Sequence, residues 1–242
     1  MQRVILFILD GLAVAPSHET NYLYAAATPY FDYIAQTYPM GLLSVPSRAD
    51  EGHELLGNGL SGVLATLGKR QEKWFDPVQL PLATYFFNGK QHESYTGETW
   101  RAFPSTIKLL QAPAAALPKC EAEFVLLSCA WPGEFIRGST AKEAVFMFEK
   151  LDRVVHTSID IMLACGSTVL ITSSYADLGK VPVMLLSKEF EGKHFKGGRE
   201  GAPITHDWHS LPVLGTLSDI APTILKLMGL EKPRDMQGNT LL

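Results

Sequence analysis

Two short segments of the chain carry side chains that can bind a metal ion. Asp10 follows the apolar run VILFIL and precedes a glycine, so its carboxylate suits either a metal ligand or a cap on the next turn. The segment THDWHS gathers His206, Asp207 and His209, and imidazoles and carboxylates are common ligands of zinc. A surface loop with incidental histidines is the alternative for the second segment.

Two further segments can bind an anion. Asn58 lies in the glycine-rich stretch LGNGLSG, whose backbone N–H groups can hold a phosphate where a helix begins, although Asn-Gly is also a common tight-turn dipeptide. Glu134 and Arg137 follow an apolar run in CAWPGEFIRGST, and they form either a substrate contact or an exposed pair. A small phosphorylated or other anionic ligand is therefore the expected binding partner.

The elements that position these residues are strands and helices in alternation. Continuous apolar runs rich in β-branched residues predict strands buried on both faces, at 4–9, 124–128, 168–172 and 181–186. The helical pattern between the second and third runs opens with the capping box Thr140/Glu143. Strand, helix and strand in this order predict a three-layer αβα sandwich with a mostly parallel central sheet. Ligand sites of such sheets form beyond the carboxyl ends of the strands, where Asp10 stands.

The rest of the chain fits one domain over residues 1–242. Shorter helices are predicted over 28–39, with Thr28 as cap and Pro29 at the first position, and over 218–229, ending at Gly229. Residues 68–82 are polar and aperiodic, which predicts a connector.

Composition excludes several classes of protein. The 242 residues are 46% hydrophobic and 19% charged, with a formal net charge of −4, which is typical of a folded globular domain. Scattered lysines and arginines give no basic footprint for nucleic acid, and the apolar run near the N-terminus is too short to span a membrane. Three cysteines without a CxxC pair favour reduced thiols and a cytoplasmic location.

Several motifs, in their order along the chain, resemble one family. VILFILDG, AAATPYFD, LGNGLSG, ATYFFNG (83–89) and the C-terminal SDIAPTILKLMGLEKPRDMQGNTLL are similar to cofactor-independent (2,3-bisphosphoglycerate-independent) phosphoglycerate mutase. The similarity is to the phosphatase-type domain of that enzyme, a member of the alkaline phosphatase superfamily. It implies an alkaline-phosphatase-like fold, a strand at TYFFNG, and a site that transfers phosphoryl groups with two metal ions.

One departure from the family is a missing domain. The family carries a transferase domain between the nucleophile loop and TYFFNG, whereas here a short connector at 63–82 stands in its place. That domain supplies most of the arginines that grip phosphoglycerate, so mutase activity is not expected.

The second departure concerns the site residues that the resemblance implies. Only Asp10 and His206 match metal ligands of the family. The nucleophilic serine falls on Gly59, and Ser61 points too far away to replace it. Other metal ligands fall on Gly133, Arg137, Ser174 and Tyr175, and the glycine that follows the last two in the family falls on Ala176.

This loss decides between the functional hypotheses. Two divalent ions about 4 Å apart repel each other by about 16 kcal/mol at an effective dielectric constant of about 20, and one Asp and one His cannot offset that. We therefore expect a binding or regulatory module without a metal. The alternative is a phosphatase or phosphoesterase with a single Mn or Zn ion, held by Asp10 and 206–209 with Glu51, His53 or Glu134. A structural subunit that packs on a protein partner is a third hypothesis, and the sequence does not specify that partner.

Overall fold

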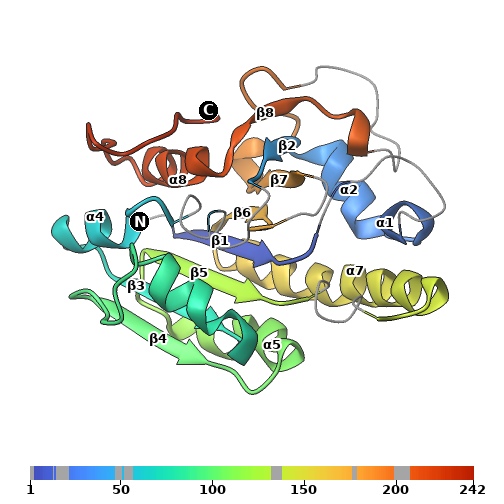
Figure 1. Cartoon of the computed structure of the whole chain (residues 1–242), viewed down its shortest axis with the longest axis horizontal. Helices are drawn as coiled ribbons and strands as arrows, with labels where there is room; N and C mark the ends of the chain where they lie inside the picture. The colour runs from blue at the N-terminus through green and yellow to red at the C-terminus, as the bar shows by residue number, and fades with distance from the viewer. Residues whose placement is uncertain are drawn as a thin grey trace.

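A computed structural model of the chain describes residues 3–12, 14, 22–46, 51, 57–131, 138–175, 179–198 and 208–242. Its centre is an eight-stranded sheet in the order β4-β3-β5-β1-β6-β7-β2-β8 (Figure 1). The strands are β1 Val4–Leu9, β2 Met40–Ser44, β3 Gln71–Phe75, β4 Glu98–Ala102, β5 Phe124–Cys129, β6 Thr168–Thr172, β7 Lys180–Leu186 and β8 Val213–Thr216. All neighbours are parallel except β7, which is antiparallel to β6 and β2. The predicted mostly parallel sheet is confirmed.

Strand β1 lies in the middle of the sheet, and its six residues are all buried. Val4 aligns with Phe124 of β5 and Thr168 of β6, and Leu9 aligns with Cys129. A strand with neighbours on both edges and helices on both faces needs apolar residues throughout, which explains the unbroken run VILFIL. The next residue, Asp10, consequently emerges at the carboxyl edge of the sheet.

Helices cover both faces of the sheet. Ile5, Phe7 and Leu9 pack in one core with α2 Pro29–Thr37, α5 Thr106–Ala116 and α7 Ala141–Ala164. Val4, Leu6 and Ile8 pack in a second core with α4 Leu60–Thr66 and α8 Ile220–Leu227. Successive side chains of a strand point to opposite faces, so the two cores are the two interfaces of a three-layer sandwich. A further α-helix, α1, spans Tyr22–Ala25.

The predicted ends of the helices are largely confirmed. In α7, Thr140 and Glu143 form the expected capping box, with the Glu143 carboxylate accepting from the Thr140 backbone N–H at 2.8 Å. Helix α2 begins at Pro29 as predicted, but Thr28 does not cap it through its side chain. Asp152 of α7 does so instead, accepting from the backbone N–H groups of Tyr30 and Phe31. No helix among the described residues is both long and apolar enough to cross a membrane.

The polar stretch 68–82 is not a plain connector, so that prediction is wrong. It forms β3, which lies between β4 and β5, and the 3₁₀ turn η1 Pro77–Gln79. Polar composition hid the strand because two of its polar residues are buried and paired. The Gln71 amide donates to the Ser61 carbonyl at 2.8 Å, and the Lys73 ammonium lies 2.5 Å from the Glu98 carboxylate.

The expected strand at TYFFNG is also wrong. Residues Pro81–Phe86 form a wide helical turn, η2, closed by a hydrogen bond from the Phe87 N–H to the Leu82 carbonyl at 2.9 Å. The prediction was carried over by resemblance. Here Pro77 and Pro81 start two successive turns, which leaves no extended segment to pair with the sheet.

Candidate functional site at the carboxyl edge

The Asp10 carboxylate is held by two neutral donors. Its Oδ1 accepts a hydrogen bond from the Ser174 hydroxyl at 2.6 Å, and its Oδ2 accepts one from the Gln79 amide at 3.0 Å. The Asp10 backbone N–H donates to the Cys129 carbonyl at 2.9 Å, which continues the pairing of β1 with β5 by one residue. Both carboxylate oxygens therefore have partners that carry no charge.

Gln79 joins Asp10 to the end of the neighbouring strand. The Oε1 atom of Gln79 accepts from the hydroxyl of Ser128 in β5 at 2.8 Å, and both side chains are buried. One amide thus uses its donor on Asp10 and its acceptor on Ser128. Because each of these polar atoms has a partner, the protein itself satisfies the hydrogen bonds of the network.

Asp76 fixes the position of Gln79. One Asp76 oxygen accepts from the backbone N–H groups of Val78 and Gln79, at 3.1 and 3.2 Å. The other accepts from the Thr106 hydroxyl at 2.7 Å and from the Ala130 N–H at 2.9 Å. This buried carboxylate therefore ties the turn η1 to the start of α5 and to the residue after β5.

On the other side of Asp10, two serines follow β6. Ser173 accepts from the Gly11 N–H at 3.2 Å and donates to the Tyr175 carbonyl at 3.1 Å, while Ser174 binds Asp10. Both serines are fully buried. Ser174 is the position where the resemblance implies a metal-binding aspartate, so a hydroxyl donor stands where a second carboxylate would be.

The donors that hold Asp10 are neutral. Each Asp10 oxygen accepts one hydrogen bond, from an O–H or an N–H group, so neither donor adds negative charge beside the carboxylate. Within the described part of the chain, no three His, Cys, Asp or Glu side chains gather closely enough to hold a metal ion. His206 and Asp207, together with Gly133, Glu134, Arg137, Ala176 and His53, lie outside the described residues.

No described contact joins His209, a further predicted ligand, to Asp10. His209 belongs to the turn η5 Trp208–Ser210, which precedes β8 and packs against α2 through an edge contact between Trp208 and Phe31. Strands β6, β7 and β2 separate β8 from β1, which corresponds to about 19 Å across the sheet. Glu51 is exposed.

The glycine-rich stretch lies towards the opposite end of the sheet. The Ser61 carbonyl binds Gln71, the first residue of β3, which aligns through Phe124 with Val4 at the start of β1. Six strand residues span about 17 Å, so the start of α4 does not face Asp10. In Figure 1, α4 accordingly lies on the side of the molecule where the N-terminus is marked and β1 begins.

Asn58 has a structural task in this position. Its side-chain amide donates to the Ser218 carbonyl at 3.0 Å and to the Gln237 carbonyl at 2.7 Å, which ties the stretch to the C-terminal segment. Gly59 has a φ of 73°, the left-handed region that glycine adopts without strain. The role of Asn58 in ligand binding stays a prediction, and both of its side-chain amide hydrogens already donate to carbonyl groups.

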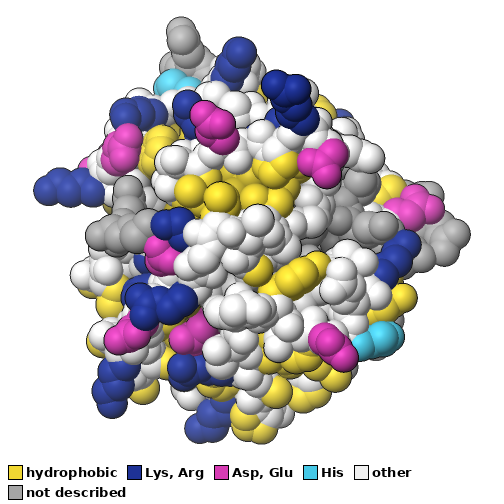
Figure 2. All heavy atoms as spheres, turned by 90° about the vertical axis from the view of Figure 1, so that its left-hand side faces the viewer, with side chains coloured by type: hydrophobic (Ala, Val, Ile, Leu, Met, Phe, Trp, Pro, Cys, Tyr) yellow, Lys and Arg dark blue, Asp and Glu magenta, His cyan; other side chains and the backbone are white. Residues whose placement is uncertain are grey.

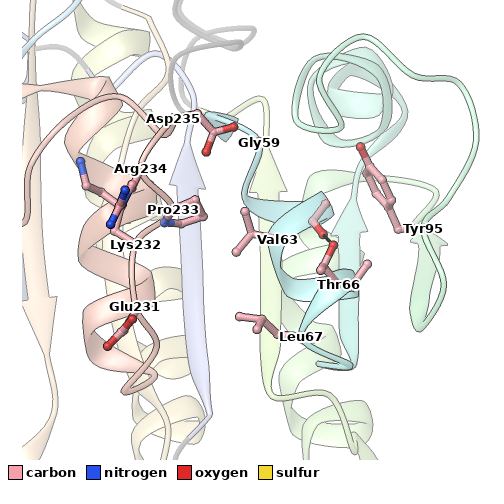
Figure 3. A pocket seen from close by; sticks show the side chains of 12 residues that line it. Gly59, Val63, Thr66, Leu67, Tyr95, Glu231, Lys232, Pro233, Arg234 and Asp235 are labelled. Carbon is pink, nitrogen blue, oxygen red and sulfur yellow. Dashed lines mark hydrogen bonds between the residues drawn. The ribbon is translucent and has the colours of Figure 1, made fainter.

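Beside Gly59, a groove of about 730 Å³ runs between α4 and the segment after α8. Figure 3 shows Gly59 and Val63 on one wall and Pro233 and Asp235 on the other. Figure 2 views the molecule from this side, where apolar patches lie among interspersed basic and acidic side chains. The groove is separate from the Asp10 network, with which it shares no lining residue.

Sequence reasoning missed Gln79 and Ser128. A signal for the first existed in FDPVQ, because an Asp before Pro often caps a turn and so fixes the residues after it. Ser128 stands near the end of the apolar run 124–129, at the edge where ligands bind. Neither signal could identify Asp10 as the partner.

Comparison with known proteins supports the resemblance. The chain is similar to 2,3-bisphosphoglycerate-independent phosphoglycerate mutases. It is 30% identical to that of Thiobacillus denitrificans over 209 residues, which are 78% of this chain and 39% of the relative. It is 28% identical to that of Rhodopseudomonas palustris, covering all of this chain and 49% of the relative. The chain thus spans less than half the length of these relatives, and no family model matches it.

Solved structures confirm the predicted alkaline-phosphatase-like sandwich. The PH0037 protein of Pyrococcus horikoshii superposes with a TM-score of 0.67 at 14% identity, over 96% of this chain and 98% of that one. The phosphoglycerate mutase of Leishmania mexicana superposes with a TM-score of 0.55 at 15% identity, over 74% of this chain and 38% of that one. At such identities the likeness establishes the fold alone.

Proposed function

We propose that this chain is a phosphoglycerate-mutase-like protein that has lost two-metal phosphoryl transfer and acts as a binding or regulatory module. The observation that carries the proposal is the pairing of Asp10 with Ser174 and Gln79, through one neutral hydrogen bond to each carboxylate oxygen. A site for two divalent cations would instead place further anionic ligands beside that carboxylate.

The surroundings of Asp10 support this proposal on electrostatic grounds. A two-metal centre needs several anionic ligands to offset the repulsion between its ions. The two side chains that bind Asp10 are instead an amide and a hydroxyl, from Gln79 and Ser174, and the nearby carboxylate of Asp76 is occupied by backbone N–H groups and Thr106. Gly59, at the position of the nucleophile, has no side chain to be phosphorylated.

The ligand proposed for the module is a small phosphorylated or anionic compound. This part of the proposal rests on Arg137, which follows β5 in the sequence and lies outside the described residues. The three cysteines form no disulfide, which agrees with a proposed cytoplasmic location.

Metal analysis tests the proposal. The protein is incubated with Mn²⁺ and Zn²⁺, desalted and measured by elemental analysis, beside Asp10→Asn and His206→Ala variants. In parallel, hydrolysis of p-nitrophenyl phosphate is followed with each metal. We expect neither stoichiometric metal nor hydrolysis in any sample. One equivalent of metal that both variants lose, together with hydrolysis, would overturn the proposal and establish the single-metal phosphatase.

A further inference from the structure

A second cavity, of about 470 Å³, opens between the start of α2 and the middle of α7. It shares no residue with the network around Asp10. Its size lies within the range of small-molecule sites, and its walls combine aromatic rings with carboxylates.

Three rings lie together at this cavity. The Tyr30 ring stacks on the His156 imidazole, with centroids 4.0 Å apart and planes at 19°. Tyr33 lies parallel to Tyr30 at 6.0 Å, and about half of its surface is exposed. The face of a tyrosine ring carries partial negative charge, so an accessible face attracts a cation.

Two carboxylates add negative charge next to these rings. Asp160 accepts from the Tyr30 hydroxyl at 3.4 Å and lies 3.1 Å from His156 Nε2. Asp152 is buried and holds the backbone N–H groups of Tyr30 and Phe31. Burial, and then the charge of Asp160, raise the pKa of Tyr30, which keeps its hydroxyl protonated as a donor.

One cation already lines the cavity. Arg153 lies among the walls, and its Nε donates to the Glu149 carbonyl one helical turn earlier, at 3.2 Å. Arg153 thus has a backbone partner in its own helix, and its positive charge also acts on Asp152. Two carboxylates, Asp152 and Asp160, and one guanidinium therefore line the cavity beside the aromatic rings, and burial raises the pKa of Asp152.

We propose that the cavity lined by Tyr30, Tyr33, His156 and Asp160 binds an organic cation of the alkylammonium or guanidinium class. The cation lies against the exposed ring of Tyr33 and is balanced by Asp160. Either a free small molecule or a lysine or arginine side chain of another protein can supply this chemistry.

Titration followed by NMR of the aromatic and histidine signals tests the proposal. The probes are tetramethylammonium and methylguanidinium, as free cations, and capped tripeptides with a central lysine or arginine, at constant ionic strength. Sodium chloride and a neutral tert-butyl alcohol serve as controls for charge and shape. The protein variants are Tyr33→Leu, which removes a ring face, and Asp160→Asn, which removes a charge. Tyr24→Leu changes an exposed ring that does not line the cavity.

We expect saturable shifts of the Tyr30, Tyr33 and His156 signals with at least one cationic probe and with neither control. Each cavity variant should weaken binding by about 3- to 30-fold, the range of a single cation–π contact, while Tyr24→Leu leaves it unchanged. Stronger binding of the free cations identifies a small-molecule ligand, and stronger binding of the tripeptides identifies a protein side chain. Absence of saturation with all cations, or equal affinity of Tyr33→Leu and the unaltered protein, would overturn the inference.

Discussion

Ser174 donates a 2.6 Å hydrogen bond to Asp10, and this contact joins the loop after β6 to the end of β1. The donor is fully buried and neutral, and the acceptor is a half-buried carboxylate. A hydrogen bond to a charged group contributes more stability than one between neutral groups, about 1.5–3 kcal/mol. The contact therefore stabilises the fold at the carboxyl edge of the sheet.

Changing Ser174 to Asp should make stability depend on pH and on metal. The new carboxylate would lie beside Asp10, so the pKa of one of the two rises above its unfolded value. Stability is then kept at low pH and falls as the pH rises above the ordinary carboxylate range. Urea unfolding at pH 5 and pH 8, compared with Ser174→Ala, measures this. Equal stability of the Asp and Ala variants at pH 8 would contradict the geometry.

The same variant offers a metal readout. Two adjacent carboxylates attract a divalent ion, so Mn²⁺ should raise the melting temperature of Ser174→Asp and leave that of Ser174→Ala unchanged. A rise in the melting temperature of Ser174→Asp with Mn²⁺, without hydrolysis of p-nitrophenyl phosphate, would show that the variant binds the metal but does not catalyse the reaction.

Removing the side chain of Asp76 should destabilise the protein by about 3–5 kcal/mol, because four donors lose their acceptor in a buried place. Asp76→Asn keeps one acceptor oxygen and should cost less than Asp76→Ala. Chemical denaturation gives both values. A cost below about 1 kcal/mol for Asp76→Ala would show that water replaces the carboxylate there.

The parts of the fold that sequence could predict are those with local signals. The run VILFIL and the three-and-four-residue spacing of apolar residues in α7 need no knowledge of their partners, and both predictions were right. Strand β3 was not predicted, because Gln71 and Lys73 can be buried only through their pairing with Ser61 and Glu98, which the local sequence does not reveal. The site divides in the same way. Asp10 was placed correctly at the end of a strand, but its partner Gln79 comes from a distant turn.

The buried pair Lys73 and Glu98 supports a further prediction. Both side chains are fully buried, and the Lys73 ammonium also binds the Asn88 side chain and lies 4.9 Å from the Phe87 ring centre. Lys73→Met alone should cost about 3–5 kcal/mol, because it leaves the Glu98 charge buried and unpaired. The double variant Lys73→Met with Glu98→Leu should cost clearly less. Additive costs in this double-mutant cycle would show that the two charges do not interact.

The pH dependence of the same pair has a definite sign. Burial lowers the pKa of Lys73 from 10.5 to about 8, although Glu98 opposes the shift. Between pH 8 and 10.5 the unfolded chain therefore binds more protons at this residue than the folded chain. Stability contributed by Lys73 must then rise with pH in that window. Tyrosines such as Tyr38, whose pKa is raised by burial, act in the opposite direction at still higher pH.

The measurement is consequently the difference in unfolding free energy between the unaltered protein and the double variant, followed from pH 7 to 10. The unfolding free energy of the unaltered protein, relative to that of the double variant, should increase as the pH rises. A constant difference would mean that Glu98 holds the ammonium charged throughout.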